Sequence, residues 1–242
     1  MKKLLLASTS TLFGETYLAY LLKDLEVFFK NTDTITFIPY ARPSGITHNA
    51  YTSIVENAFS KINKKVIGLH TFSNPIVGIA ESNAIFTGGG NTFMLVYQLY
   101  KQNLMQILKE KIEDGTPYFG TSAGSNIAGI SMQTTNDMPI IYPKSFNTLG
   151  LVDFNINAHY LDPNPESTHN GETRETRIKE FHCFNNTPVI GLREGNYIHI
   201  KKEKTTLKGS GTARIFLPNK APYESDSLLF NKNKEKHHFK RV

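Results

Sequence analysis

Short apolar runs alternate with helix-like patterns through the first half of the chain, and this alternation constrains the fold more than any other feature. The runs predict strands at residues 3–7, 34–39, 65–69, 84–87 and 117–120. Between the runs, apolar side chains such as Leu18, Leu21 and Leu25 recur at helical spacing. This spacing predicts helices at residues 15–30, 48–63, 75–82, 92–100, 103–114 and 123–130. Because strands that alternate with helices form parallel sheets covered on both faces, the sequence predicts an α/β fold.

The second half of the chain is less regular. Strands are predicted at residues 138–142, 154–157, 189–192, 197–201, 204–208 and 214–217, with a polar loop at 162–171 and a helix at 172–184. Glu194-Gly195 and Gly209-Ser210-Gly211 are turn sequences, so we expect the last strands to pair as antiparallel hairpins. No repeat or low-complexity linker divides the chain. We therefore expect one α/β domain over residues 1–230, followed by a basic, flexible tail at residues 231–242.

The positive charge of the chain is concentrated at its C-terminal end. The formal net charge is +6, but residues 231–242 contain five lysines and arginines against one acid, Glu235. The rest of the chain is therefore nearly balanced. A nucleic-acid-binding face needs many basic side chains on one surface of the fold, so we expect no nucleic-acid partner.

Cysteine content and hydropathy favour a cytoplasmic protein. Cys183 is the single cysteine, so no intrachain disulfide can form, which fits a reducing compartment. It lies in an amphipathic helical pattern, which predicts a buried packing thiol. The N-terminal apolar run is shorter than the ~7–15 residues of a signal peptide. No stretch approaches the ~18 apolar residues of a membrane span, so we expect no membrane partner.

The segment Gly120-Thr121-Ser122-Ala123-Gly124 matches the pattern G-x-S-x-G. In such an elbow the chain turns sharply from a strand into a helix, and the serine hydroxyl is exposed in a strained backbone conformation. The predicted strand at 117–120 and helix at 123–130 supply the required context. Ser122 is therefore a candidate nucleophile, although a glycine-rich turn with an N-capping serine would give the same pattern.

A serine nucleophile needs a base, and a histidine suits this role near neutral pH. His159 is the preferred candidate because it follows the predicted strand at 154–157, at the sheet edge where α/β folds place their sites. His182 and His199 lie within a predicted helix and strand. Asp137 and Glu194 both compete to orient the histidine, and the residues alone leave that choice open.

An acyl-transfer site also needs donors for the oxyanion. The N–H of Ala123 is one candidate, and the glycine loop that contains Gly89 and Gly90 supplies the second at the same sheet edge. The chain has no G-x-x-x-x-G-K-[ST], no G-x-G-x-x-G opening a helix, no H-E-x-x-H and no C-x-x-C. We therefore expect neither a cofactor nor a metal.

Six segments together resemble the peptidase E family, the α-aspartyl dipeptidases among the serine peptidases. They lie at residues 88–93, 120–126, 134–139, 157–159, 171–175 and 191–196, and the likeness extends over about residues 1–220. The resemblance implies a fold like that of the class I glutamine amidotransferases, a three-layer α/β/α sandwich. It also implies hydrolysis of dipeptides with an N-terminal aspartate, without metal. Thr121 departs from the family, in which many relatives carry a bulky aromatic residue.

Carried over by position, the resemblance implies that Ser122 is the nucleophile and His159 the base. It assigns the third member of the triad to either Asp137 or Glu194, and the amidotransferase-like fold favours Glu194. Substrate recognition is less specified. A guanidinium grips a carboxylate bidentately, so Arg174 or Arg177 could bind the aspartate side chain, with Asn91 as a further contact. Both arginines could equally be solvated charges on a helix face.

Two other functions remain open from the sequence. One is a related serine hydrolase on the same scaffold, either cyanophycinase-like or an esterase. The other is a binding protein that keeps the fold without catalysis. The sequence leaves the oligomeric state undetermined.

Overall fold

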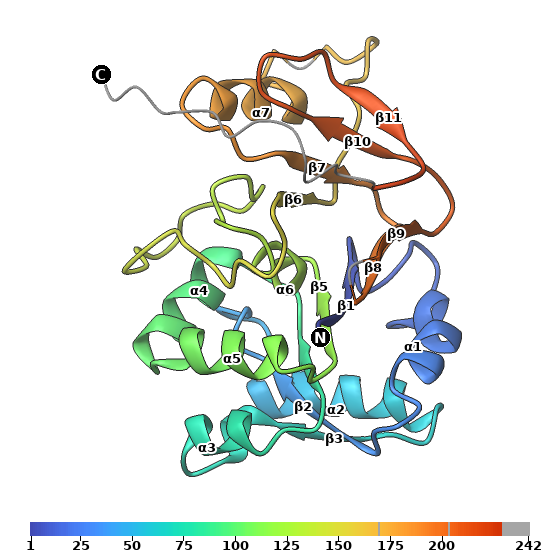
Figure 1. Ribbon diagram of the computed structural model, residues 1–242, viewed down its shortest axis with the longest axis vertical. Helices are drawn as coiled ribbons and strands as arrows, with labels where there is room; N and C mark the ends of the chain where they lie inside the picture. Colours follow the sequence, from blue (N-terminus) through green and yellow to red (C-terminus); the bar gives the residue numbers. More distant parts are fainter. Residues whose placement is uncertain (169, 203, 229–242) are drawn as a thin grey trace.

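A seven-stranded sheet forms the centre of the computed structural model, which describes residues 1–168, 170–202 and 204–228 (Figure 1). Five of its strands run parallel: β1 (Lys3–Ala7), β2 (Thr34–Ile38), β3 (Lys65–Gly68), β4 (Ile85–Thr87) and β5 (Tyr118–Thr121). The antiparallel strands β8 (Tyr197–Lys201) and β9 (Lys204–Lys208) extend it beside β1. The strand order is β3-β2-β4-β5-β1-β8-β9. The predicted α/β class, with mostly parallel strands and antiparallel C-terminal strands, is confirmed.

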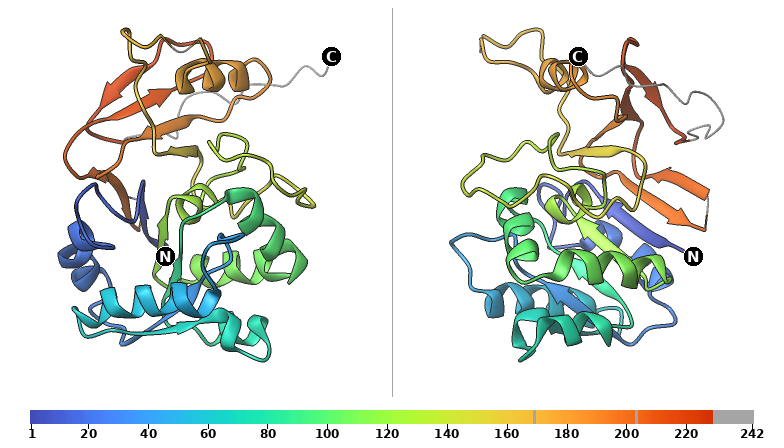
Figure 2. Two further views of the ribbon diagram at one scale, coloured as in Figure 1. Left: turned by 180° about the vertical axis from the view of Figure 1, so that it is seen from behind. Right: turned by 60° about the vertical axis from the view of Figure 1, so that its left-hand side comes forward.

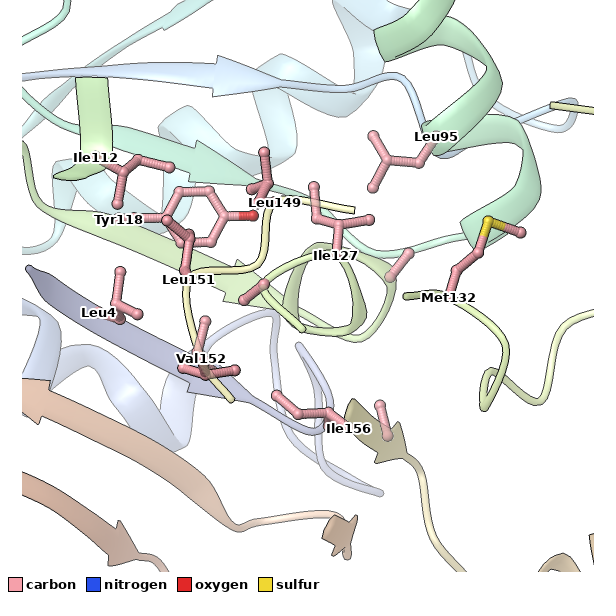
Figure 3. Close-up of a cluster of buried hydrophobic side chains, with 14 of the residues drawn as sticks. Leu4, Leu95, Ile112, Tyr118, Ile127, Met132, Leu149, Leu151, Val152 and Ile156 are labelled. Atoms are coloured by element: carbon pink, nitrogen blue, oxygen red, sulfur yellow. The ribbon is translucent and has the colours of Figure 1, made fainter. Parts of the chain in front are cut away.

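Helices cover both faces of this sheet because its strands are apolar on both sides. In β1, Leu4 and Leu6 enter one buried cluster, while Leu5 and Ala7 enter the other. The first cluster packs under α3, α4, α5 and α6, and Figure 3 shows part of it around Tyr118. The second packs under α1 and α2. The helices are α1 (Leu22–Phe28), α2 (His48–Ser60), α3 (Pro75–Ala80), α4 (Thr92–Lys101), α5 (Leu104–Glu113) and α6 (Ala123–Asn126), with short 3₁₀ helices at Ala19–Leu21 and Leu69–Thr71.

A second sheet of four strands lies at one end of the molecule (Figures 1 and 2). Its order is β11-β10-β7-β6, made from β6 (Asn155–Ala158), β7 (Val189–Leu192), β10 (Ala213–Phe216) and β11 (Tyr223–Ser225). β6 and β7 are parallel, and the other pairs are antiparallel. The helix α7 (Arg174–His182) covers this sheet through Ile178. The chain passes between the two sheets at residues 193–196, the segment that contains Glu194.

The strand predicted at residues 138–142 is wrong. This segment forms a loop whose apolar side chains face solvent, with Met138 76%, Ile140 53% and Tyr142 87% exposed. Pro139 cannot donate a backbone hydrogen bond, and none of the described strands pairs with the segment. The apolar residues of this segment suggested a strand, but none of the described strands lies beside it to form hydrogen bonds.

Two predicted helices are shorter than the sequence suggested, and one side chain is exposed rather than buried. The helix predicted from residue 15 begins only at Ala19, after Leu18 adopts a left-handed conformation with φ 60°. The helix predicted at 123–130 ends at Asn126. Cys183 is exposed, contrary to the prediction, because Ile178 is the only buried residue of the polar helix α7. The predicted tail at 231–242 lies outside the described residues.

Candidate active site

Ser122 lies at the turn between β5 and α6, in a backbone conformation that few side chains adopt. Its φ and ψ are 51° and −112°, and its N–H donates to the carbonyl of Ala7 at 3.0 Å. The flanking glycines allow this turn by close packing. A Cβ at Gly120 would lie 2.5 Å from the carbonyl oxygen of Gly124, and a Cβ at Gly124 would overlap the carbonyl oxygen of Thr87. The elbow therefore needs both glycines for steric reasons, as the pattern suggested.

His159 follows β6 of the second sheet, and its side chain reaches Ser122, which follows β5 of the first sheet. Its Nε2 lies 2.9 Å from the Ser122 Oγ. Like Ser122, it has a positive φ, of 54°. Its backbone N–H donates to the Ser8 Oγ at 2.8 Å, and the Ser8 hydroxyl donates to the carbonyl of Leu192 at 2.7 Å. Ser8 thus links the ends of β1, β6 and β7, which fixes the unusual backbone of His159.

Sequence reasoning missed Ser8. The signal was a serine that directly follows the predicted strand at residues 3–7, at the strand end where Ser122 also lies; the structure shows this serine to be buried. The sequence does not show that a second sheet packs at this end of the first one. That packing brings the ends of β6 and β7 to the Ser8 hydroxyl.

Glu194 contacts the other nitrogen of the same imidazole. Its Oε1 lies 2.6 Å from the His159 Nδ1, and the two side chains are 49% and 37% exposed. The parallel register of β6 and β7 aligns Ala158 with Leu192. The segments that follow these two residues, which carry His159 and Glu194, therefore leave the sheet side by side. A carboxylate can only accept, so the Nδ1–H donates to Glu194. That tautomer leaves Nε2 free to accept the Ser122 hydroxyl proton.

The carboxylate of Asp137, the other candidate acid, binds the start of α4 instead. Its Oδ2 accepts from the Thr92 N–H at 2.7 Å, the Thr92 hydroxyl at 2.6 Å and the Thr135 hydroxyl at 2.9 Å. None of the hydrogen bonds of the described residues joins Asp137 to His159. An anion at a helix N-terminus satisfies free N–H groups and complements the helix dipole. The environment of Asp137 is therefore that of a helix cap.

Three backbone N–H groups of the glycine loop and the elbow have no hydrogen-bond acceptor among the described residues: those of Gly89, Gly90 and Ala123. A Cβ at Gly89 would lie 3.7 Å from the Ser122 Oγ, so this glycine borders the hydroxyl directly. Gly90 has φ +144°, and a Cβ there would overlap the carbonyl of Ala41. The glycine loop is thus held against the elbow, where its N–H groups are available to a ligand.

Asn91, predicted to contact substrate, is occupied by local structure. Its Oδ1 accepts from the N–H of Met94 at 3.0 Å, which caps α4, and its Nδ2 donates to the carbonyl of Met138 at 2.9 Å. The side chain ties α4 to the loop that carries Asp137. Asn91 therefore stabilises the backbone beside the glycine loop.

The two candidate arginines lie in different environments. Arg174 is half-buried, and its Nη1 is buried without a hydrogen-bond partner in the part of the chain that the structure describes. Burial, followed by the positive charge of Arg177, lowers the pKa of Arg174, while the charge of Glu194 opposes this shift. Arg177 is 59% exposed and lies 3.8 Å from Glu172. Within the described residues, Arg174 is therefore the candidate arginine with a buried, unpartnered guanidinium nitrogen, and the charge of Glu194 acts on it.

The described residues contain no group of three or more His, Cys, Asp or Glu side chains arranged to hold a metal ion. Within the same part of the chain, none of the helices is long and apolar enough to cross a membrane. The site brings together the Ser122 hydroxyl, the His159 imidazole and the Glu194 carboxylate.

Comparison with known proteins relates this site to a family. The model of peptidase family S51 matches residues 4–208. Peptidase E of Streptomyces coelicolor is 44% identical over 221 residues, which are 91% of this chain and 90% of that protein. A Drosophila melanogaster protein named "probable alpha-aspartyl dipeptidase" is 45% identical over 218 residues, 89% of this chain and 90% of that protein.

A solved structure shares the fold at much lower sequence identity. A peptidase from an acI-B1 Actinobacterium superposes with a TM-score of 0.71, covering 94% of this chain and 95% of that one at 14% identity. The family model and the two relatives cover nearly the whole chain, and they confirm the resemblance seen in the sequence. The chain belongs to peptidase family S51 and is a serine peptidase of that family.

Proposed function

We propose that the chain is a dipeptidase that hydrolyses dipeptides with an N-terminal aspartate, with Ser122 as nucleophile, His159 as general base and Glu194 as the third member of the triad. The hydrogen-bonded chain Ser122 Oγ–His159–Glu194, with contacts of 2.9 and 2.6 Å, carries this proposal. The names of the relatives that are called peptidase E and α-aspartyl dipeptidase support the choice of substrate.

The first half of the reaction is acylation. The Ser122 Oγ attacks the carbonyl carbon of the substrate aspartate, and His159 Nε2 takes the hydroxyl proton. Glu194 accepts the Nδ1–H throughout and stabilises the imidazolium that forms. His159 then gives the proton to the leaving nitrogen as the peptide C–N bond breaks. The second amino acid leaves, and the aspartyl group stays on Ser122 as an ester.

The second half reverses these roles with water. His159 takes a proton from a water molecule, which attacks the ester carbonyl, and then returns it to the Ser122 Oγ as the C–O bond breaks. Free aspartate is released. The negative oxygen that forms twice in the cycle needs two donors, for which the N–H groups of Ala123 and of Gly89 or Gly90 are proposed. Loss of one such donor typically lowers the rate ~10²–10³-fold.

We assign recognition of the substrate carboxylate to Arg174. Its buried Nη1 has no hydrogen-bond partner among residues 1–168, 170–202 and 204–228, and an unpaired buried donor is costly unless a ligand satisfies it. A bidentate carboxylate would do so. Arg177 lies one turn further along α7, is exposed and is already near Glu172, so it provides a matched control on the same helix.

The test is a hydrolysis panel of Asp-Leu, Asn-Leu, Glu-Leu and Leu-Leu with wild-type enzyme and the Ser122→Ala, Arg174→Ala and Arg177→Ala variants. We expect cleavage of Asp-Leu, no turnover by Ser122→Ala, and loss of the preference for Asp-Leu in Arg174→Ala alone. Wild-type activity in Ser122→Ala would refute the nucleophile. Undiminished preference in Arg174→Ala would refute the assignment of that arginine.

The same panel separates the alternative hydrolases. An esterase would cleave p-nitrophenyl acetate well and Asp-Leu poorly. A cyanophycinase-like enzyme would cleave aspartate-linked polymer rather than free dipeptides. A binding protein without catalysis would retain Asp-Leu without cleaving it.

A further inference from the structure

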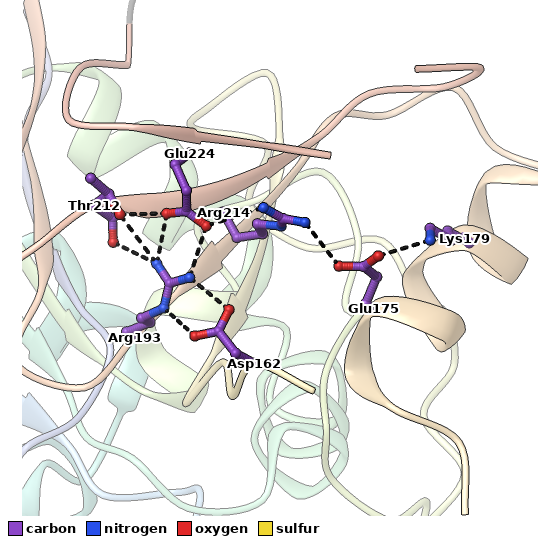
Figure 4. Close-up of polar contacts among 7 residues, drawn as sticks. All are labelled: Asp162, Glu175, Lys179, Arg193, Thr212, Arg214 and Glu224. Atoms are coloured by element: carbon purple, nitrogen blue, oxygen red, sulfur yellow. Dashed lines mark hydrogen bonds and ion pairs between the residues drawn. The ribbon is translucent and has the colours of Figure 1, made fainter. Parts of the chain in front are cut away.

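The arginine next to Glu194 is held by two carboxylates from distant segments (Figure 4). Arg193 Nε and Nη2 donate to the two oxygens of Asp162 at 2.8 and 2.7 Å. Its Nη1 and Nη2 donate to the two oxygens of Glu224 at 3.0 and 2.9 Å. Nη1 also donates to the carbonyl of Thr212 at 3.0 Å. One guanidinium thus joins the loop after β6, the approach to β10, and β11.

This cluster is more rigid than an isolated surface ion pair. Both carboxylates bind the guanidinium through two oxygens, a geometry that fixes direction as well as distance. The Arg193 side chain is 26% exposed, so solvent screens it only in part. Its hydrogen bond is the largest cause that lowers the pKa of Glu224 to about 2, and it also lowers the pKa of Asp162. Charged hydrogen bonds therefore hold Arg193 in one position.

Arg193 and Tyr160 lie next to the two triad residues His159 and Glu194 at the ends of β6 and β7. His159 and Tyr160 follow β6, while Arg193 and Glu194 follow β7, and the Tyr160 N–H donates to the carbonyl of Leu192 at 3.1 Å. The Arg193 guanidinium lies over the Tyr160 ring, 5.6 Å from its centroid. The two strand ends are thus joined by a second contact beside the His159–Glu194 hydrogen bond.

The cluster continues to the helix that carries Arg174. Arg214, in β10, lies 3.4 Å from the Glu224 carboxylate and 3.3 Å from that of Glu175. Glu175 directly follows Arg174 in α7 and also pairs with Lys179 at 2.8 Å. The chain of ion pairs therefore runs from the residue before Glu194 to the residue after Arg174 (Figure 4).

Glu194 needs such support. Its side chain is half exposed, and its backbone lies in a turn between the two sheets. Among the described residues, its carboxylate hydrogen-bonds to His159 alone. A flexible, half-exposed carboxylate samples many rotamers unless the backbone beneath it is fixed. A displacement of ~1 Å in a catalytic group can cost ~10²-fold in rate.

We propose that Arg193 is a positioning residue that holds Glu194 within reach of His159, and that the Arg214–Glu175 branch holds Arg174 toward the substrate carboxylate. Arg193 acts through Glu194 and does not touch the substrate. The inference rests on the proposed function for the roles of Glu194 and Arg174. It adds that the two ends of one ion-pair cluster control different kinetic constants.

The first experiment is a double-mutant cycle on Asp-Leu hydrolysis with Arg193→Lys and Glu194→Gln. Lysine keeps the charge but cannot bind two carboxylates bidentately. We expect Arg193→Lys to lower kcat ~10–100-fold in the wild-type background and about 2-fold or less in the Glu194→Gln background, because a residue that acts through Glu194 loses its effect when Glu194 is gone. An equal fall in both backgrounds, or an unchanged kcat, would overturn the proposal.

The second experiment separates the two branches. Glu175→Gln should raise KM for Asp-Leu several-fold and change kcat about 2-fold or less. Arg193→Lys should lower kcat and change KM about 2-fold or less. Lys64→Gln removes an ion pair with Asp33 (3.6 Å) before β2 and β3, at the opposite sheet edge, and is the matched control that should change neither constant. A KM effect from Arg193→Lys, or a kcat effect from Glu175→Gln, would contradict the division of roles.

Two safeguards keep these tests decisive. If Arg193→Lys fails to fold, as judged by circular dichroism, Asp162→Asn and Glu224→Gln each remove one carboxylate and should lower kcat by a smaller factor. If wild-type enzyme fails to cleave Asp-Leu but cleaves p-nitrophenyl acetate, the proposed substrate is refuted. The cycle between residues 193 and 194 can then still be measured on the ester, where unchanged kcat in Arg193→Lys would refute the positioning role separately.

Discussion

Substitution of Asp137 by alanine should separate the stability of this enzyme from its catalysis. The Asp137 carboxylate accepts from the Thr92 N–H at 2.7 Å and the Thr92 hydroxyl at 2.6 Å, and Thr92 is fully buried at the first position of α4. Removal of the carboxylate leaves the N–H and hydroxyl of buried Thr92 without this acceptor. The site of damage is therefore the start of α4.

The size of the effect follows from these contacts. A buried N–H without an acceptor costs ~1–3 kcal/mol, and loss of an anion at a helix N-terminus adds ~0.3–1 kcal/mol. We therefore expect Asp137→Ala to lower the free energy of unfolding by about 3 kcal/mol. For a chain of this length each kcal/mol shifts Tm by ~2–4 °C, so Tm should fall by about 6–12 °C. Asp137→Asn keeps one acceptor oxygen and should lose less.

The assay combines urea unfolding with Asp-Leu kinetics at 25 °C, below the unfolding transition of every variant. In Asp137→Ala we expect kcat within about fivefold of wild type, because its carboxylate does not contact His159. Glu194→Gln should behave in the opposite way. Loss of the acid of a triad lowers kcat ~10⁴-fold when the histidine takes the wrong tautomer, while a half-exposed side chain should change stability by about 0.5 kcal/mol or less.

One result would refute this reasoning. If Asp137→Ala lowered kcat ~10⁴-fold with its unfolding free energy within about 0.5 kcal/mol of wild type, and Glu194→Gln left kcat nearly unchanged, Asp137 would be the third member of the triad. The hydrogen bond between Glu194 and His159 would then be irrelevant to the reaction.

Three further predictions test the elbow, the ion-pair cluster and the corrected cysteine. Gly124→Ala should lower the free energy of unfolding by about 3 kcal/mol in urea titrations, since its Cβ overlaps the Thr87 carbonyl; Gly211→Ala, with no contact closer than 3.9 Å, is the control. Arg193 lowers the pKa of Glu224 to about 2 in the folded protein, below the unfolded value of ~4.3. The ionised Glu224 therefore stabilises the fold fully above pH ~4.3, and this contribution is lost as the pH falls toward 2. Urea titrations across that range should be less steep in pH for Glu224→Gln, and an equal slope would contradict the assignment. Cys183 should react with a thiol reagent such as DTNB in the native protein without loss of activity, and protection from the reagent until unfolding would restore the buried assignment.

Much of the central fold follows from local patterns in the sequence. The five parallel strands are short apolar runs, and β1 alternates Leu4 and Leu6 with Leu5 and Ala7 toward opposite cores. Apolar periodicity of this kind is a property of the segment itself, so it survives whatever the segment packs against. It failed where apolar residues had nothing to pack against, as with Met138 and Ile140, because no sheet edge was available to them.

The exposure of Cys183 shows a second limit of sequence patterns. The pattern in residues 172–184 correctly predicted a helix, but the prediction of a buried thiol assumed that its apolar side would be covered. In the structure α7 meets the second sheet through Ile178, and Cys183 lies at its end, beyond that contact. Burial depends on where a neighbouring element stops, and periodicity does not contain that information.

The sequence by itself indicated the α/β class, the strand–turn–helix at Ser122 and the glycines that such a turn requires, because the alternation of strand and helix patterns and the elbow motif can be read from residues close in the chain. Only the tertiary structure decided which acid faces His159. Asp137 and Glu194 are both 35 residues or fewer from His159 in the sequence, and both lie next to segments that suit the role. The parallel pairing of β6 with β7 brings Glu194 to 2.6 Å from the imidazole, while the start of α4 takes Asp137. A hydrogen bond is decided by distances of less than 1 Å, and these arise only when separate elements are packed together.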